Sequence, residues 1–158
     1  MQRIERHAVV ADGVITALSN FTQMPPPNLQ PFQVEKCVRG VLEINPVPEN
    51  IAVTIDCPSN VPPALGDVDQ MRIVFGNLIR NGCEAMPRGG RLTIQGRLAG
   101  DSVEIQVADN GVAIPEENLG LAIVRAIVDK NKGSLEVTSQ AGLGTACVVR
   151  LPAAGPAS

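Results

Sequence analysis

The sequence of 158 residues contains no tryptophan, no tyrosine and only three phenylalanines. We therefore expect an aliphatic core, and we disfavour base stacking on aromatic side chains as a main activity. The net charge of −3 also argues against a nucleic-acid-binding surface, so we expect no nucleic-acid partner. The single histidine is His7. Enzymes built on a histidine base, a pair of histidine metal ligands or a Ser-His-Asp triad thus have one candidate residue.

Cysteine use points away from metal binding. No two of the four cysteines form a CxxC pair, and with one histidine a zinc site is not expected. We interpret the thiols as reduced, in a cytoplasmic domain. No apolar run approaches the roughly 18 residues of a membrane span. The N-terminal segment also lacks the apolar part of a signal peptide. The cysteines are Cys37, Cys57, Cys83 and Cys147.

The length suits one domain with a short appendage, and hydrophobic spacing divides it into elements. Prolines 25–27 must end any preceding helix, because proline lacks the backbone N–H and disfavours helix in the residue before it. Asp67 is predicted to cap the longest helix, with Gln70 reaching back to complete a capping box. We predict helices over residues 2–23, 33–43, 67–86 and 119–132, and strands over residues 51–55, 91–98, 102–109, 134–140 and 145–151.

Short turns between adjacent strands predict an α+β fold. We expect a two-layer α/β sandwich, with a mixed, mostly antiparallel sheet and helices on one face, preceded by an N-terminal helix. The helix over residues 2–23 is amphipathic and has no partner within itself. We therefore expect it to pair with another helix, and a second copy of the chain would make a homodimer.

The longest helix carries a stripe of polar residues beside its buried face. Asn77 and Asn81 lie one turn apart on this stripe, and carboxamide oxygens at that spacing are neutral ligands suited to Mg²⁺ that also holds phosphates. A solvated helix face is the alternative interpretation. Ile73 within the stripe hints that it is partly covered. The other polar members are Gln70, Arg80 and Glu84.

Three further segments could contact a ligand. Asp109 ends an apolar strand, where its carboxylate could accept a hydrogen bond from the amine of a base, and Gly111 follows with room for close approach. Residues 118–121 open a helix, whose free N–H groups bind phosphate. Residues 142–145 join two strands through glycines. Each segment alone is also an ordinary loop or hairpin.

The order of these segments is more specific than any one of them. It resembles the ATP-binding domain of sensor histidine kinases, within the wider group that includes DNA gyrase, heat-shock chaperone ATPases and MutL. The resemblance covers about residues 34–152. Its segments are Asn77–Met86 (the N box), Asp109–Ile114 (the G1 box), Leu119–Val124 (the end of the G2 box) and Gly142–Thr145 (the final glycine box).

The resemblance implies ATP and Mg²⁺ as cofactors, and transfer of the γ-phosphoryl group to a histidine on a dimerisation hairpin. A response regulator is the further implied partner. Asp109 would hold the adenine amine, supported by Thr145. Asn81 would coordinate Mg²⁺, and Asn77, the candidate catalytic residue, would lie near the phosphates. The nucleotide would also be lined by Gly111, Ala113, Gly120, Leu121 and Gly144.

The resemblance also implies a division of the chain. Residues 1–24 would be the second helix of the hairpin, 25–32 a proline-rich linker, 33–152 the catalytic domain and 153–158 a tail. His7 lacks the proline that follows a phosphoacceptor histidine in this family. We therefore interpret it as an ordinary helix residue, and expect the acceptor histidine to lie on a helix that this chain does not contain.

The chain departs from the family pattern in ways that predict weak ATP turnover. Ala113 replaces the second glycine of the G1 box, Gly82 stands where alanine is usual, and Glu117-Asn118 replaces the glycines that begin the G2 box. Ile114–Asn118 runs straight into Leu119, so the long lid is missing. Lids exclude water and complete phosphate contacts.

Two functions remain open from the sequence. The leading hypothesis is a sensor histidine kinase domain. The alternative is a non-enzymatic, degenerate kinase-fold module that acts in phosphotransfer or regulates a partner, for which His7 would have to be the acceptor. An anti-sigma-type serine kinase shares the fold, but the proline joint after a dimerisation-like helix favours the sensor kinase.

Overall fold

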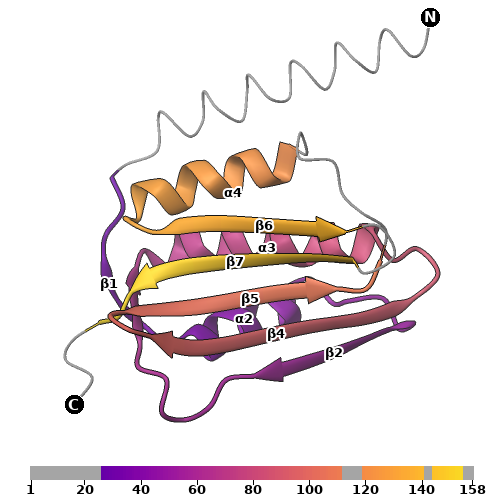
Figure 1. The fold of residues 1–158 in the computed structure, drawn as a ribbon, viewed down its shortest axis with the longest axis horizontal. Coiled ribbons are helices and arrows are strands. Elements are labelled where there is room, and N and C mark those ends of the chain that lie inside the picture. The colour runs from indigo at the N-terminus through magenta and orange to yellow at the C-terminus, as the bar shows by residue number, and fades with distance from the viewer. Residues whose placement is uncertain (1–25, 112–118, 141–143, 155–158) are drawn as a thin grey trace, which may run out of the picture.

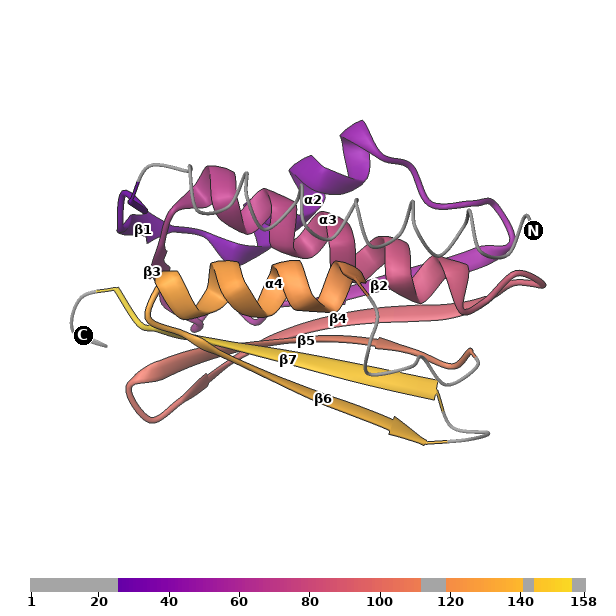
Figure 2. The same ribbon diagram turned by 90° about the horizontal axis from the view of Figure 1, so that it is seen from above.

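A layer of helices packs on one face of a five-stranded sheet in the computed structural model, which describes residues 26–111, 119–140 and 144–154. All helices of the described segments lie on the same side of the sheet (Figure 2). This arrangement confirms the expected α+β sandwich. The predicted helix over residues 2–23, including His7, and the shortened segment 114–118 lie outside the described residues.

The described helices agree closely with those predicted from hydrophobic spacing. Each begins and ends within about two residues of the expected position, because each presents a continuous apolar stripe to the sheet. They are α2 (Val34–Ile44), α3 (Val68–Glu84) and α4 (Leu119–Lys130).

The five-stranded sheet has the strand order β2-β4-β5-β7-β6 (Figure 1). Strands β2 and β4 run parallel, and every other neighbouring pair is antiparallel, so the sheet is mixed and mostly antiparallel as expected. Its strands are β2 (Ile51–Asp56), β4 (Gly90–Ala99), β5 (Ser102–Asp109), β6 (Ser134–Gln140) and β7 (Gly144–Pro152).

A second, two-stranded sheet was not predicted. Strand β1 (Gln30–Phe32) pairs antiparallel with β3 (Ala64–Gly66). Both strands have three residues, too few to show an alternating pattern, and β1 contains a proline. The pairing buries Phe32 against the domain and fastens the proline-rich segment to the start of α3.

The core is aliphatic, as the shortage of aromatic residues predicts. Helix α3 supplies its centre with Met71, Val74 and Phe75, all fully buried. The sheet meets this helix with side chains from alternate positions of β4 and β5, including Leu92 and Ile105.

The start of α3 is fixed by a buried polar cluster that we call the Asp67–Asn131 latch. Asp67 Oδ1 accepts hydrogen bonds from the N–H groups of Asp69 and Gln70, which confirms the predicted cap. The prediction that the Gln70 side chain completes a capping box is wrong. Gln70 Oε1 instead accepts a hydrogen bond from Asn131 Nδ2 at 2.8 Å, because the end of α4 packs over the first turn of α3.

The latch also reaches the chain that precedes the domain. Asp67 Oδ2 accepts a hydrogen bond from the backbone N–H of Asn28 at 3.0 Å. Asn131 is fully buried, and its Oδ1 accepts a hydrogen bond from the Asp67 N–H at 2.8 Å. One cluster therefore joins the incoming chain, the start of α3 and the end of α4.

Gly133 directly follows the predicted helix over residues 119–132, but it does not end α4 through a left-handed backbone. The residue with the left-handed backbone is Lys132, at φ 64°. Gly133 is required for another reason: a Cβ there would overlap the carbonyl oxygen of Arg150 on β7. The glycine therefore allows close approach between the chain leaving α4 and the sheet.

The outer face of the sheet carries a ladder of ion pairs centred on Glu104. Its neighbours Val103 and Ile105 face the core, but the Glu104 carboxylate is also almost covered, with 7% of the side chain exposed. It bonds Arg97 of β4, with Nη2–Oε1 at 2.6 Å, and Arg150 of β7. Both guanidinium groups hold the pKa of Glu104 below its ordinary value, and the hydrogen bond from Arg150 has the larger effect. The outer face of the sheet is thus tied across three strands.

None of the helices in the described part of the chain is both long and apolar enough to cross a membrane.

Candidate functional site

The predicted site residues gather at one end of the sheet. The end of β5, the start of β7 and the start of α4 lie together there (Figure 1). Asp109 ends β5, and Thr145 lies directly opposite it on β7. The second half of α3, with Asn77 and Asn81, lies over this end of the sheet, since Gly82 packs against Asp109.

Asp109 is held by its neighbours in one orientation. Its Oδ1 accepts a hydrogen bond from the N–H of Gly111 at 2.9 Å. Burial raises the pKa of Asp109 above its ordinary value, while the backbone N–H groups of Gly111 and Thr145 lower the pKa and offset part of that effect. A half-buried carboxylate of this kind is a strong acceptor for an N–H donor that enters the site.

Gly82 allows α3 to approach Asp109 closely. A Cβ at this position would lie 3.6 Å from Asp109 Oδ2 and 2.9 Å from Leu92 Cδ1. The missing side chain at Gly82 therefore lets the helix lie directly against the Asp109 carboxylate and Leu92. Cys83 and Cys147 also lie near Asp109. Burial first, and then the Asp109 charge, raises the pKa of both thiols, so both stay protonated near neutral pH.

Two other glycines form the site by their lack of a side chain. A Cβ on Gly111 would overlap the carbonyl oxygen of Ala85 at the end of α3. Gly144 has φ 96°, a backbone conformation that favours glycine, and a Cβ there would overlap the carbonyl oxygen of Asp109. These two of the three glycines predicted to line the ligand are therefore needed to bring β5, β7 and α3 together.

Asn81 offers the clearest sign of a missing ligand. Its side chain is buried, with 7% of the residue exposed, and its Nδ2 has no hydrogen-bond partner in the described segments. A buried amide without a partner costs roughly 1–3 kcal/mol. A bound group that presents a hydrogen-bond acceptor to Nδ2 would remove that cost. Neutral amide oxygens are also ligands that Mg²⁺ accepts alongside phosphates. The unpaired Nδ2 therefore fits an acceptor such as a phosphate oxygen, and Oδ1 is the atom of Asn81 that would hold Mg²⁺.

Asn77 lies one turn earlier on α3 and is half-buried. Its Nδ2 donates a hydrogen bond to the carbonyl oxygen of Ile73 at 2.9 Å. This bond fixes the orientation of the amide group, so that its oxygen is turned away from the helix backbone. Asn77 is thus placed beside Asn81 with an acceptor to offer.

The rest of the polar stripe on α3 does not form one surface. Gln70 is buried in the latch, whereas Arg80 and Glu84 are exposed. Gln70 and Asn81 are buried, so the stripe is partly covered as expected, but Ile73 itself is 43% exposed. The end of α4 covers the stripe at Gln70, where Asn131 bonds its side chain.

The remaining predicted residues are located only in part. Gly120 and Leu121 lie in the first turn of α4, where backbone N–H groups have no partner within the helix, and Leu121 is buried. Ala113 lies outside the described residues. The start of α4 thus provides donors suited to an anion at the same end of the sheet.

Ser139 was not predicted as a site residue. Its Oγ lies 3.0 Å from Thr145 Oγ1, and the two residues are paired between β6 and β7. Ser139 occupies the same set of alternate positions on β6 as the buried Leu135 and the part-buried Val137, which places it on the face toward the helices. That pattern was the available signal, but the register between β6 and β7 could not be read from the sequence.

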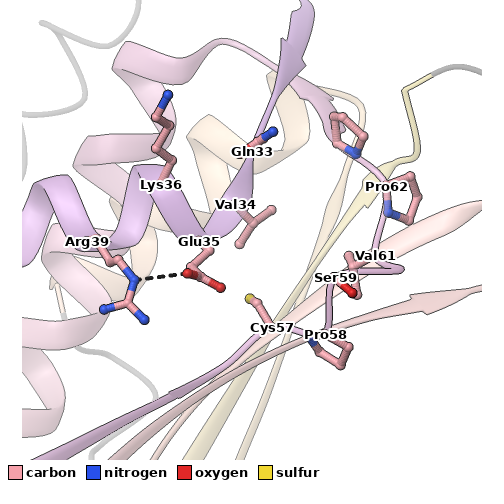
Figure 3. A pocket seen from close by; sticks show the side chains of 11 residues that line it. Gln33, Val34, Glu35, Lys36, Arg39, Cys57, Pro58, Ser59, Val61 and Pro62 are labelled. Carbon is pink, nitrogen blue, oxygen red and sulfur yellow. Dashed lines mark hydrogen bonds and ion pairs between the residues drawn. The ribbon is translucent and has the colours of Figure 1, made fainter.

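A separate cavity of about 390 Å³ opens between the start of α2 and the segment after β2 (Figure 3). Glu35 and Arg39 form an ion pair at 3.0 Å on its α2 side, and the Cys57 thiol points into it. None of the residues that line it is a predicted site residue. The cavity is therefore distinct from the cluster around Asp109.

Comparison with protein families supports the resemblance. Residues 66–155 match the family described as histidine kinase-, DNA gyrase B- and HSP90-like ATPases. Sporulation kinase C of Bacillus subtilis is 32% identical over 143 residues, which cover 76% of this chain and 32% of that protein. The chain spans about a third of the length of the curated relatives it matches.

Solved structures with the same fold include two complexes. Full-length ShkA in complex with AMPPNP aligns with a TM-score of 0.74 at 19% identity, covering 92% of this chain and 37% of ShkA. The histidine kinase ThkA in complex with the response regulator TrrA aligns with a TM-score of 0.76 at 20% identity, covering 96% of this chain and 49% of that chain. At these identities the likeness establishes the fold.

Proposed function

The chain belongs to the family of histidine kinase-, DNA gyrase B- and HSP90-like ATPases, and we propose that it is the ATP-binding catalytic domain of a two-component sensor histidine kinase. The observation that carries this proposal is the buried Asn81 Nδ2, which has no hydrogen-bond partner in the described residues and lies at the same end of the sheet as Asp109. The site combines an acceptor for a base amine with a carboxamide suited to a metal and phosphates.

Within this proposal the residues divide between base and phosphates. Asp109 accepts a hydrogen bond from the exocyclic amine of adenine, and Thr145 supports that contact. Asn81 holds Mg²⁺, and Asn77 contributes its amide oxygen next to the phosphates. Gly111, Gly120, Leu121 and Gly144 line the nucleotide, and Ala113 is assigned beside them from the sequence alone.

In phosphoryl transfer the protein mainly positions the reacting groups and stabilises charge. Bound MgATP supplies the γ-phosphoryl group that moves to a histidine on a dimerisation hairpin. The chain's own contribution is orientation. The Asp109 carboxylate is fixed by the Gly111 N–H, and the Asn77 amide by the Ile73 carbonyl oxygen. Groups held in place before the reaction lose little entropy on binding.

We also propose that turnover by these 158 residues is weak. Only three residues separate Pro115 from Leu119, where a lid would cover the phosphates. A short segment leaves water near the phosphates and removes contacts to them. The base pocket does not depend on that segment, so ADP binding should survive better than phosphoryl transfer.

The alternative, a non-enzymatic module for phosphotransfer or partner regulation, is favoured by the same short segment. ThkA was solved with a response regulator, and we propose a response regulator as the partner here in either case. We further propose a homodimer through residues 2–23 and a cytoplasmic location, where ATP is available. Light scattering on the chain with and without residues 2–23 tests the dimer.

Calorimetric titration with ATP, with and without Mg²⁺, tests the proposal, and Asp109→Asn serves as a base-pocket control. We expect ADP and ATP to bind the unsubstituted chain, more tightly with Mg²⁺. Asn81→Ala should remove the Mg²⁺ dependence, while Asp109→Asn should weaken both nucleotides. Absence of ADP binding would overturn the nucleotide-binding function. Micromolar ATP affinity with phosphorylation of a separately supplied histidine hairpin would overturn the claim of weak turnover.

A further inference from the structure

Asp109, Thr145 and Ser139 form one row across three neighbouring strands. Asp109 of β5 is paired with Thr145 of β7, which is paired in turn with Ser139 of β6. Directly opposed residues point to the same face of a sheet. On the other side of Asp109 the row continues to Leu92, which is fully buried, so the row faces the helices.

This polar row marks the end of the apolar core. Two residues further along each strand, on the same face, the corresponding row consists of Val107, Cys147 and Val137. Thr145 is 4% exposed, so its hydroxyl is removed from water and needs a partner. Ser139 Oγ supplies that partner at 3.0 Å. The hydrogen bond limits the rotation of the Thr145 side chain beside the Asp109 carboxylate.

The direction of this hydrogen bond decides what Thr145 can offer to a base. A hydroxyl has one proton to donate and two lone pairs. If Ser139 donates to Thr145 Oγ1, the Thr145 proton remains free. A carboxylate that only accepts, next to a hydroxyl that donates, matches the amine and the adjacent ring nitrogen of adenine. Guanine presents the reverse order at these positions, a carbonyl oxygen and a ring N–H.

We propose that Ser139 is a positioning residue of the nucleotide site, which donates to Thr145 Oγ1 and thereby helps the site to select adenine over guanine. This inference rests on the proposed nucleotide-binding function. It adds a residue from strand β6, at the edge of the sheet, to a site otherwise formed by α3, α4, β5 and β7.

The test compares ADP and GDP in NMR titrations of the unsubstituted chain, Ser139→Ala, Thr145→Val and the double variant. Loss of one hydrogen bond should weaken ADP binding by roughly fivefold in Ser139→Ala. The affinity for GDP should change little, so the ratio of ADP affinity to GDP affinity should fall in Ser139→Ala. Ser139 acts through Thr145, so Ser139→Ala should have no further effect on a chain that already carries Thr145→Val.

Thr138→Ala is the matched control, because Thr138 is the neighbouring hydroxyl on β6 and lies exposed on the opposite face. It should leave both nucleotides unaffected. Equal losses for ADP and GDP in Ser139→Ala would overturn the inference, since they would indicate a general structural effect. Additive losses in the double variant would overturn it as well.

A second measurement needs no nucleotide. Three-bond couplings to the Thr145 methyl group should show a single χ1 rotamer in the unsubstituted chain and averaging in Ser139→Ala. An unchanged rotamer would overturn the positioning role. Absence of ADP binding by the unsubstituted chain would instead overturn the proposed function and the base selection, while the rotamer measurement still decides the role of Ser139.

Discussion

Asn131 Oδ1 accepts a hydrogen bond from the backbone N–H of Asp67 at 2.8 Å, across 64 positions of the chain. The contact joins the end of α4 to the start of α3. On each helix the predicted ligand-binding residue lies at the end away from this contact: Leu121 near the start of α4 and Asn81 near the end of α3. The latch therefore sets how far the two groups of site residues lie from one another along the helix axes.

Asn131→Ala should destabilise the domain by about 2–4 kcal/mol. The substitution leaves the Asp67 N–H without an acceptor and the buried Gln70 Oε1 without its donor. Urea unfolding followed by circular dichroism measures the effect, since the chain has no tryptophan to report it. Asn60→Ala, at an exposed loop position, is the control and should stay within about 0.5 kcal/mol. A similarly small change for Asn131→Ala would contradict the latch.

Gly144→Ala and Gly40→Ala should change stability in opposite directions. At Gly144 the φ of 96° and the overlap with the Asp109 carbonyl oxygen both oppose a Cβ, so we expect a loss of more than about 2 kcal/mol. At Gly40, within α2, a Cβ meets nothing within 4 Å, and alanine should stabilise the helix by about 0.5–1 kcal/mol. Thermal unfolding of both variants checks the pair. A stable Gly144→Ala protein would mean that the turn before β7 can rearrange.

Glu104→Gln should lower stability at neutral pH by about 1–2 kcal/mol. The folded chain favours the ionised carboxylate, so the pKa of Glu104 is lower when folded than when unfolded. The stabilisation is therefore complete above the unfolded value, about 4.3, and is lost as the pH falls through the lower folded value.

The difference in stability between the unsubstituted chain and Glu104→Gln should thus shrink between pH 5 and pH 3. Glu136→Gln is the matched control, since Glu136 is 60% exposed and bonds only one end of the ladder. It should change stability by a few tenths of a kcal/mol at any pH. A pH-independent difference for Glu104→Gln would show that the charge contributes nothing.

Adenosine affinity should fall on acidification at a pH above the ordinary aspartate value of about 3.9. Burial raises the pKa of Asp109, and the protonated group loses acceptor capacity for the base amine. Adenosine is the suitable ligand, because the phosphates of ADP titrate in the same range. The Cys83 and Cys147 thiols stay protonated throughout and add nothing to the profile. Asp109→Asn should bind weakly, with no pH dependence over this range; the same profile in both chains would exclude Asp109 as the titrating group.

The sequence predicted those parts of the fold in which one residue pattern decides the outcome. Helix α3 and the hairpin of β4 and β5 follow from their apolar periodicity, and Asp67 follows from the local preference for a cap. Asp109 and Gly144 could be assigned because their spacing matches a family pattern. The pairing of β5 with β7 was not needed for that assignment.

What escaped prediction depends on how separate elements pack and pair with one another. Gln70 has the right type and spacing for a capping box. Its side chain instead accepts a hydrogen bond from the Asn131 amide, because Asn131 is fully buried and has no water to bond. Ile73 matches a core residue in type, yet 43% of it is exposed. Ser139 has an ordinary strand pattern, and only the register between β6 and β7 brings it to Thr145.

Gly111 and Gly144 leave no room for a Cβ atom, because neighbouring backbone carbonyl groups occupy the space that it would take. This has a consequence for mutational scanning. A saturation library selected only for folding should already reject every substitution at these two positions. At Asn81 the same library should be permissive, since the native amide has no partner in the described protein, and intolerance should emerge only under selection for ligand binding. The difference between the two selections would separate the walls of the site from the groups that act within it.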